Sequence, residues 1–228
     1  MKRVHRWAAT LAGIGIAALV VVGVLMRLMD GMFEEGQGIR DLEDAGLKRR
    51  SIAGPKGLTL SYFQTGDPAL GRVVYCHGTP GDANAWSRYL LEPVGGMGSV
   101  TYDRPGFGQT APLRALPGLA DQAAAMVPFL LDPGPKPILV GHSLGGPIIV
   151  RAALDYPELV GGLVIAAGDL DPDLEKWMWY NRLADTGLAR LVIPSTMTRS
   201  NDELKPIKAD LLEMSGRLGT LQVPVILI

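Results

Sequence analysis

The chain has 228 residues, enough for one domain with a substantial hydrophobic core. Its formal net charge is −1, so it carries no basic excess that could neutralise phosphates, and we expect no nucleic-acid partner. Its single cysteine excludes an internal disulfide and a cysteine-rich metal cluster, and we expect neither a metal nor another cofactor.

An apolar stretch lies near the N-terminus. Residues 7–26 carry no charge, and as a helix they would span about 30 Å, the thickness of the hydrocarbon core of a bilayer. Lys2, Arg3 and Arg6 precede this stretch. The positive-inside rule then predicts a single-pass protein with a cytoplasmic N-terminus and the remainder on the outer (periplasmic or extracellular) side. Residues 1–30 are interpreted as a membrane anchor, with a cleaved signal peptide or a buried core helix as alternatives.

The remainder of the chain divides into a linker and one domain. Residues 31–50 are charged and contain glycines, and they are interpreted as the linker. Over residues 51–228, apolar runs separated by helical patterns indicate an α/β domain with a mostly parallel sheet and helices on both faces. Strands are predicted within residues 58–66, 72–78, 98–108, 137–143, 159–168 and 223–228, the last of them buried, and helices over residues 120–131 and 145–156.

A segment rich in charge interrupts this alternation. Residues 171–217 are interpreted as a mostly helical cap insertion over the sheet. Within it, Trp177, Trp179 and Tyr180 are candidates for lining a substrate pocket. The alternative is that these three aromatic side chains pack the insertion onto the sheet.

The residues Gly-His-Ser-Leu-Gly, at positions 141–145, form a G-x-S-x-G pattern. They lie between a predicted strand and a predicted helix, which is the context of a nucleophile elbow, a sharp turn that exposes its serine hydroxyl above the sheet. The N-terminus of the following helix adds backbone N–H donors near a developing anion. The pattern predicts Ser143 as a catalytic nucleophile that forms an acyl-enzyme.

A second loop is a candidate for an oxyanion hole. The residues Cys-His-Gly-Thr-Pro-Gly, at positions 76–81, follow an earlier predicted strand. We expect the backbone amides of Thr79 and Leu144 to hold the oxyanion, each of them contributing roughly a hundredfold or more in rate. An ordinary turn between a strand and a helix is the alternative interpretation.

Three motifs resemble those of the α/β-hydrolase superfamily: HGTPG at residues 77–81, YDRPGFG at residues 102–108 and GHSLGG at residues 141–146. The resemblance covers residues 58–228. It implies the α/β-hydrolase fold and a serine hydrolase of the esterase or proline-iminopeptidase-like kind, which cleaves an ester, thioester, amide or peptide bond. Haloalkane dehalogenases and epoxide hydrolases are less similar, because they carry aspartate at the position of the serine.

The partners of Ser143 are harder to assign. The histidines are His5, His77 and His142, and none of them follows Ser143, whereas in this fold the base histidine comes later in the chain. We expect His142 to belong to the elbow itself and His77 to brace the oxyanion loop. We expect Cys76 to be a small core residue at the end of its strand and not a nucleophile. Asp169 and Asp171 are the candidates for the catalytic acid, with the alternative that this segment only opens the insertion as a turn or helix cap.

The last residues are apolar, whereas natural termini are usually exposed and polar. In the family that the motifs resemble, such a strand is followed by a further strand and a histidine loop. We therefore expect a C-terminally truncated chain that lacks both, is inactive by itself and aggregates through its open strand edge. A pseudoenzyme or a frameshift is the alternative. The function hypotheses are a membrane-anchored serine hydrolase of small esters, amides or short peptides, and a catalytically inactive binding or scaffold module.

Overall fold

The computed structural model describes Val21 and residues 39–168, 170–174, 176–190 and 193–228. The predicted anchor therefore lies outside the described residues, apart from Val21, and so does the linker as far as residue 38. In the part of the chain that is described, no helix has both the length and the apolar character that a membrane span requires.

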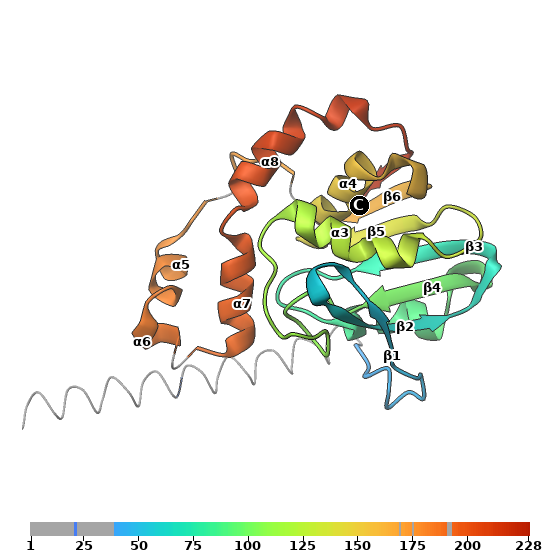
Figure 1. The fold of residues 1–228 in the computed structure, drawn as a ribbon, viewed down its shortest axis with the longest axis horizontal. Coiled ribbons are helices and arrows are strands. Elements are labelled where there is room, and N and C mark those ends of the chain that lie inside the picture. The colour runs from blue at the N-terminus through green and yellow to red at the C-terminus, as the bar shows by residue number, and fades with distance from the viewer. Residues whose placement is uncertain (1–20, 22–38, 169, 175, 191–192) are drawn as a thin grey trace, which may run out of the picture.

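The strands of the described residues form one sheet, in the order β1-β2-β4-β3-β5-β6-β7 (Figure 1). The first two strands pair antiparallel, as do β2 and β4, whereas β4, β3, β5, β6 and β7 run parallel. The predicted mostly parallel sheet is confirmed. The strand bounds are β1 Arg50–Ala53, β2 Thr59–Thr65, β3 Asp67–Cys76, β4 Met97–Tyr102, β5 Ile138–His142, β6 Gly162–Ala166 and β7 Val225–Leu227.

Helices cover both faces of the sheet. Alternate residues of a strand point to opposite faces, so a strand that is apolar throughout has apolar side chains on both faces that helices must cover. In β3, Val74 and Cys76 join the main core, which contains α3 (Leu119–Leu130) and α4 (Gly145–Asp155). Figure 1 shows these two helices together in front of the strands. The alternating β3 residues Val73 and Tyr75 join a smaller cluster with η2 (Ala83–Trp86) and α2 (Ser87–Leu91).

The segment predicted as a cap insertion is helical, but its last helix belongs to the main core. The helices α5 (Trp179–Ala184), α6 (Gly187–Arg190) and α7 (Ser195–Leu204) extend away from the sheet (Figure 1). In α8 (Ile207–Ser215), by contrast, the side chains of Ile207, Leu211 and Met214 are buried in the core cluster that holds α3 and α4.

Residues 223–228 were predicted to form a buried strand. The predicted strand is present, but the prediction that it is buried was wrong. Strand β7 forms, but Val225, Ile226 and Leu227 are 43%, 57% and 70% exposed. The reason is position: β7 is last in the strand order and pairs with β6 alone. An apolar run indicates that a strand prefers burial, but burial requires neighbouring elements, and within the described residues all three β7 side chains are exposed.

Candidate active site

Ser143 occupies a strained turn between β5 and α4. Its φ is +51°, a left-handed conformation that is uncommon for residues other than glycine and that costs of order 1–3 kcal/mol. Two backbone hydrogen bonds hold the turn: Ser143 N donates to Ala166 O at 3.0 Å, and Gly146 N donates to Ser143 O at 2.8 Å. The local geometry is that of the predicted nucleophile elbow.

The glycines of the pattern are required by close backbone contacts. A Cβ on Gly141 would collide with the carbonyl oxygen of Gly145, and a Cβ on Gly145 would collide with that of Cys76. Residues without a side chain therefore allow α4 to begin directly against β3 and β5.

The loop after β3 passes beside Ser143. A Cβ built on Gly78 would lie only 3.0 Å from the Cβ of Ser143. Among the hydrogen bonds of the described residues, none is donated by the amide of Thr79 or of Leu144. The Thr79 hydroxyl is also buried without a partner. The two amides expected to form the oxyanion hole thus belong to segments that meet at Ser143, and neither donates a hydrogen bond within the described residues.

His77 is fully buried and both of its ring nitrogens are occupied. Nε2 accepts a hydrogen bond from Arg104 N at 3.0 Å, so the ring proton resides on Nδ1, which donates to Gly78 O at 2.7 Å. Burial, together with the nearby Arg104 guanidinium, holds the pKa of His77 well below its usual value. His77 therefore braces the loop as a neutral residue, as expected, and is not available as a base for Ser143.

Arg104 fixes the same loop from a second direction. Its Nε donates to His77 O at 2.9 Å and its Nη2 donates to Gly78 O at 2.8 Å. The Gly78–Thr79 peptide bond is trans, so its C=O and N–H point in opposite directions. By holding the Gly78 oxygen, Arg104 and His77 determine the direction of the Thr79 N–H, the expected oxyanion donor.

The Arg104 guanidinium is paired in turn with Glu203 of α7. Nη1 lies 2.7 Å from Oε2, and both side chains are buried. Burial is the largest single influence and opposes the charge of Arg104, but the charge and hydrogen bonds of Glu203, with smaller contributions from Cys76 and Tyr102, together raise the pKa of the guanidinium. Gln122 donates a further hydrogen bond to Glu203 Oε2 at 3.0 Å. A helix of the insertion is thereby connected to the loop beside Ser143.

Sequence reasoning missed this support for the loop. Asp103 and Arg104 served only to identify the YDRPGFG motif. In the structure, the buried Asp103 carboxylate accepts hydrogen bonds from Arg49 Nη1 at 2.7 Å and from Ala83 N at 2.9 Å. Nothing in the sequence indicates that Glu203 pairs with Arg104, because Glu203 belongs to a charged segment 99 positions away.

Of the two candidates for the catalytic acid, the structure describes only Asp171. Asp169 lies outside the described residues. Asp171 is exposed, and its Oδ1 accepts a hydrogen bond from Asp173 N at 2.9 Å. This hydrogen bond is compatible with the turn-opening role, and the role of Asp171 as the catalytic acid stays a prediction. No hydrogen bond joins the Ser143 hydroxyl to an imidazole of the described chain.

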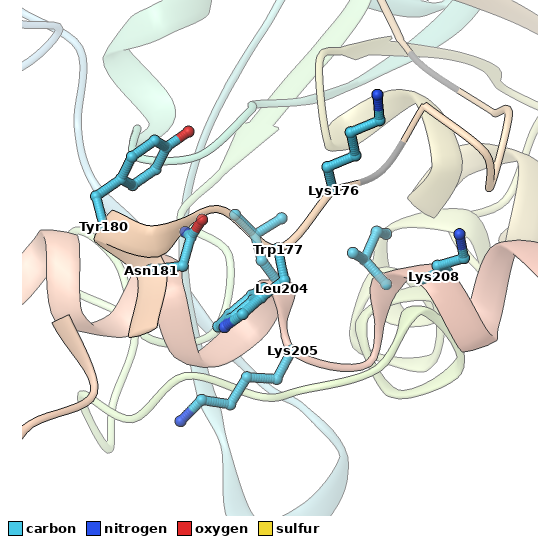
Figure 2. A pocket seen from close by; sticks show the side chains of 8 residues that line it. Lys176, Trp177, Tyr180, Asn181, Leu204, Lys205 and Lys208 are labelled. Atoms are coloured by element: carbon cyan, nitrogen blue, oxygen red, sulfur yellow. The ribbon is translucent and has the colours of Figure 1, made fainter. Parts of the chain in front are cut away.

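The predicted substrate pocket forms only in part. Trp177 and Tyr180 line a cavity of about 240 Å³ beside α7, with Leu204 among its other lining residues. Figure 2 shows Trp177 and Leu204 in the middle of the view, among the side chains that line this cavity. Trp179 does not line it and is 71% exposed. Ser143 does not border the cavity either, so the aromatic residues and the elbow are not brought together.

Comparison with known proteins identifies relatives of the chain. The acetyltransferase component of the acetoin cleaving system of Cupriavidus necator is 33% identical over 106 residues, which cover 46% of this chain and 28% of that protein. The 2-hydroxy-6-oxononadienedioate/2-hydroxy-6-oxononatrienedioate hydrolase of a Pseudomonas species is 33% identical over 102 residues, covering 42% of this chain and 36% of that protein. The chain thus spans well under half of either curated relative.

Solved structures share the fold. The epoxide hydrolase VrEH1 from Vigna radiata has a TM-score of 0.61 and 14% identity, and the match covers 80% of this chain and 79% of that chain. At this identity the likeness concerns the fold alone. The model of the alpha/beta hydrolase family matches residues 73–218, which include the elbow, the oxyanion loop and α7. Together with the strand order and the geometry at Ser143, this match shows that the chain belongs to the alpha/beta hydrolase family.

Proposed function

We propose that the protein is a serine hydrolase that cleaves an ester, thioester, amide or peptide bond through an acyl-enzyme on Ser143. The Ser143 Oγ attacks the substrate carbonyl, and the Thr79 and Leu144 amides stabilise the resulting oxyanion. The bond to the leaving group breaks as that group takes up a proton, and water then releases the acyl group as an acid. The observation that carries the proposal is the strained conformation of Ser143 directly beside Gly78.

The described residues do not supply a general base for Ser143. His77 is neutral and fully engaged, and His142 is exposed at the end of β5 without a hydrogen bond to the serine. Loss of a triad base costs up to about a millionfold in turnover. We therefore expect the 228-residue chain alone to be nearly inactive. The same observation favours the second candidate function, a binding or scaffold module that needs no base.

Rescue by imidazole separates these functions. Hydrolysis of p-nitrophenyl butyrate is measured with and without imidazole for the wild type, Ser143→Ala and the matched control Ser51→Ala, whose serine is exposed on β1. A hydrolase should recover part of the roughly 10²–10⁴-fold that a positioned base contributes. Imidazole alone also cleaves p-nitrophenyl esters, so the rate without protein is subtracted; the remaining gain should be lost in Ser143→Ala and kept in Ser51→Ala. Mass spectrometry should find the butyryl group on Ser143.

The contrary result is equally specific. If imidazole accelerates hydrolysis to the same extent in wild type and Ser143→Ala, and no acyl adduct forms, the serine is not a nucleophile. The protein would then be assigned to the binding-module class.

We also propose that residues 1–30 anchor the protein in a membrane, with the hydrolase domain on the outer side. The support is the uncharged stretch at residues 7–26 and the preceding Lys2, Arg3 and Arg6. The expressed chain should stay in the membrane fraction after a carbonate wash, and deletion of residues 7–26 should release it. Protease added from the outside should cut the domain. Release of the undeleted chain by carbonate would contradict the anchor.

A further inference from the structure

A second groove of the structure is strongly basic. It lies between residues 113–117 and the insertion helices α6 and α7, and it measures about 740 Å³. It does not include Ser143. Its charged lining residues comprise five cationic side chains and a single carboxylate: Lys56, Arg114, Arg190, Arg199, Lys205 and Asp202.

Three of these cations have carboxylate partners. Lys56 Nζ lies 2.6 Å from Asp121 Oδ2. Arg190 and Lys205 share two carboxylates, because each of them pairs with both Asp185 and Asp202. Three positive charges are therefore balanced by three negative charges, and these pairs leave the groove without an excess of either sign.

Arg114 and Arg199 supply the unbalanced charge. Neither guanidinium has a hydrogen-bond or ion-pair partner in the described part of the chain. The Nε of Arg199 is buried and has no acceptor, although buried N–H donors are almost always paired. Burial also lowers the pKa of Arg199, and no nearby carboxylate offsets this effect.

The groove is anchored to the rigid part of the molecule. Leu116, in its wall, accepts a hydrogen bond from Gln122 Nε2 at 3.0 Å through its carbonyl oxygen. The same nitrogen donates to Glu203 of α7. The two walls are therefore joined at a buried network, so that a ligand would meet a preformed surface.

We propose that this groove binds an anionic group, a carboxylate or a phosphate, through Arg114 and Arg199. A planar guanidinium offers several N–H donors in a fixed geometry that matches the oxygens of either group. The anion would satisfy the buried Nε of Arg199 and neutralise the two unpaired charges. The site does not require Ser143 to be nucleophilic, so this proposal can be tested independently of the proposed hydrolase activity.

The side-chain Nε–Hε resonance of Arg199 reports on the site directly. The ¹⁵N-labelled chain is titrated at constant ionic strength with inorganic phosphate, and separately with monomethyl glutarate, a carboxylate that also carries an ester. Chloride serves as the reference anion. Constant ionic strength matters because screening alone weakens exposed charge interactions. The resonance is identified by its disappearance in Arg199→Gln.

The expected result is a saturable shift that chloride does not produce. Arg114→Gln should weaken the apparent affinity about tenfold or more, because a hydrogen bond to a charged group contributes about that much. The control Arg88→Gln removes an exposed arginine of α2 and should leave the affinity unchanged. The probe that binds more tightly identifies the chemistry: phosphate indicates a phosphate ligand, and the half-ester indicates a carboxylate ligand.

Two outcomes would overturn the proposal. One is the absence of a saturable shift with either probe while the backbone amide spectrum shows a folded chain. The other concerns the double variant Arg114→Gln/Arg199→Gln, in which binding is monitored by the backbone amide resonances of residues 113–117. Binding of either probe to this variant with the wild-type affinity would show that the two arginines do not form the site.

Discussion

Cys76 and Ser143 are both nucleophilic side chains, and burial separates their chemistry. Ser143 is partly exposed at the elbow, whereas Cys76 is completely buried at the end of β3, with its Sγ 3.5 Å from Tyr102 Oη. Burial raises the pKa of the thiol to about 11. Because the thiolate is the reactive form, the environment of Cys76 removes its reactivity, which agrees with its interpretation as a core residue.

We predict that iodoacetamide modifies Cys76 very slowly in the folded protein at pH 8. With a pKa of about 11, only about one thiol in a thousand is ionised at that pH, and the buried position reduces access further. Unfolding in urea should accelerate modification at least about a hundredfold. Mass spectrometry of the intact chain measures both rates. Rapid modification of the folded chain would show that Cys76 is accessible.

The pH dependence of stability should report the buried His77. Its pKa is depressed by burial, while in the unfolded chain it is about 6.5. Below about pH 6.5 the unfolded state takes up a proton that the folded state does not, so the free energy of unfolding should fall as the pH decreases towards the depressed pKa. The slope approaches about 1.4 kcal/mol per pH unit. Above that window, this contribution is fully present.

Urea unfolding between pH 5 and pH 8 measures this slope. His77→Gln should lower stability at pH 8 and should flatten the slope, since the titrating group is removed. His142→Gln is the matched control, because His142 is exposed at the end of β5, and it should leave the slope unchanged. An identical slope in wild type and His77→Gln would exclude His77 as its origin.

At the scale of elements, the ion pair between Arg104 and Glu203 connects α7 to the loop that carries Gly78 and Thr79. Glu203→Gln should destabilise the protein by about 3–5 kcal/mol, because it leaves the buried Arg104 charge without a counterion. The neighbouring residue of the same helix provides a control: Asp202 makes partly exposed ion pairs, and Asp202→Asn should cost only about 0.2–1 kcal/mol. Urea unfolding of the two variants measures the difference.

A second measurement tests what the pair does for the loop. Because Arg104 holds the Gly78 carbonyl, Glu203→Gln should change the ¹⁵N and ¹H shifts of the Thr79 amide, and Asp202→Asn should not. If Glu203→Gln destabilises the protein but leaves the Thr79 amide unchanged, the ion pair is purely structural and does not orient the oxyanion donor.

Local sequence patterns predicted where helices and strands form, but they did not predict which residues these elements contact. The strands β2 to β7, α3, α4 and the turn at Ser143 follow from short-range signals: apolar runs, the G-x-S-x-G glycines and the helix that follows them. The strand β1 (Arg50–Ala53) was not predicted, because its four residues carry no apolar run. The link to Glu203 could not be predicted, because it joins residues 99 positions apart. The helix α8 was assigned to the insertion because its segment is rich in charge. Its Ile207, Leu211 and Met214 nevertheless complete the main core, and this depends on tertiary contacts.

At the scale of the whole molecule, burial is distributed unevenly across the sheet. In β6, Leu163 is 1% exposed, whereas in the adjacent β7, Leu227 is 70% exposed. Both are leucines in paired parallel strands, and β7 carries the outer edge in the strand order. An exposed apolar strand edge is a template for pairing with another chain, so the same feature that contributes little to stability should promote self-association.

Paired substitutions test this distribution. Leu163→Ala should lower the free energy of unfolding by about 2–5 kcal/mol, because it creates a cavity in the core. Leu227→Lys should change it by no more than about 0.5 kcal/mol, since the side chain is exposed. Leu227→Lys should also reduce concentration-dependent association in sedimentation velocity, because a charge on the edge opposes pairing. If instead Leu227→Lys destabilises the protein as strongly as Leu163→Ala, then β7 is buried against another surface in solution. Its apolar sequence would then reflect a contact that the strand makes, rather than an edge that it exposes.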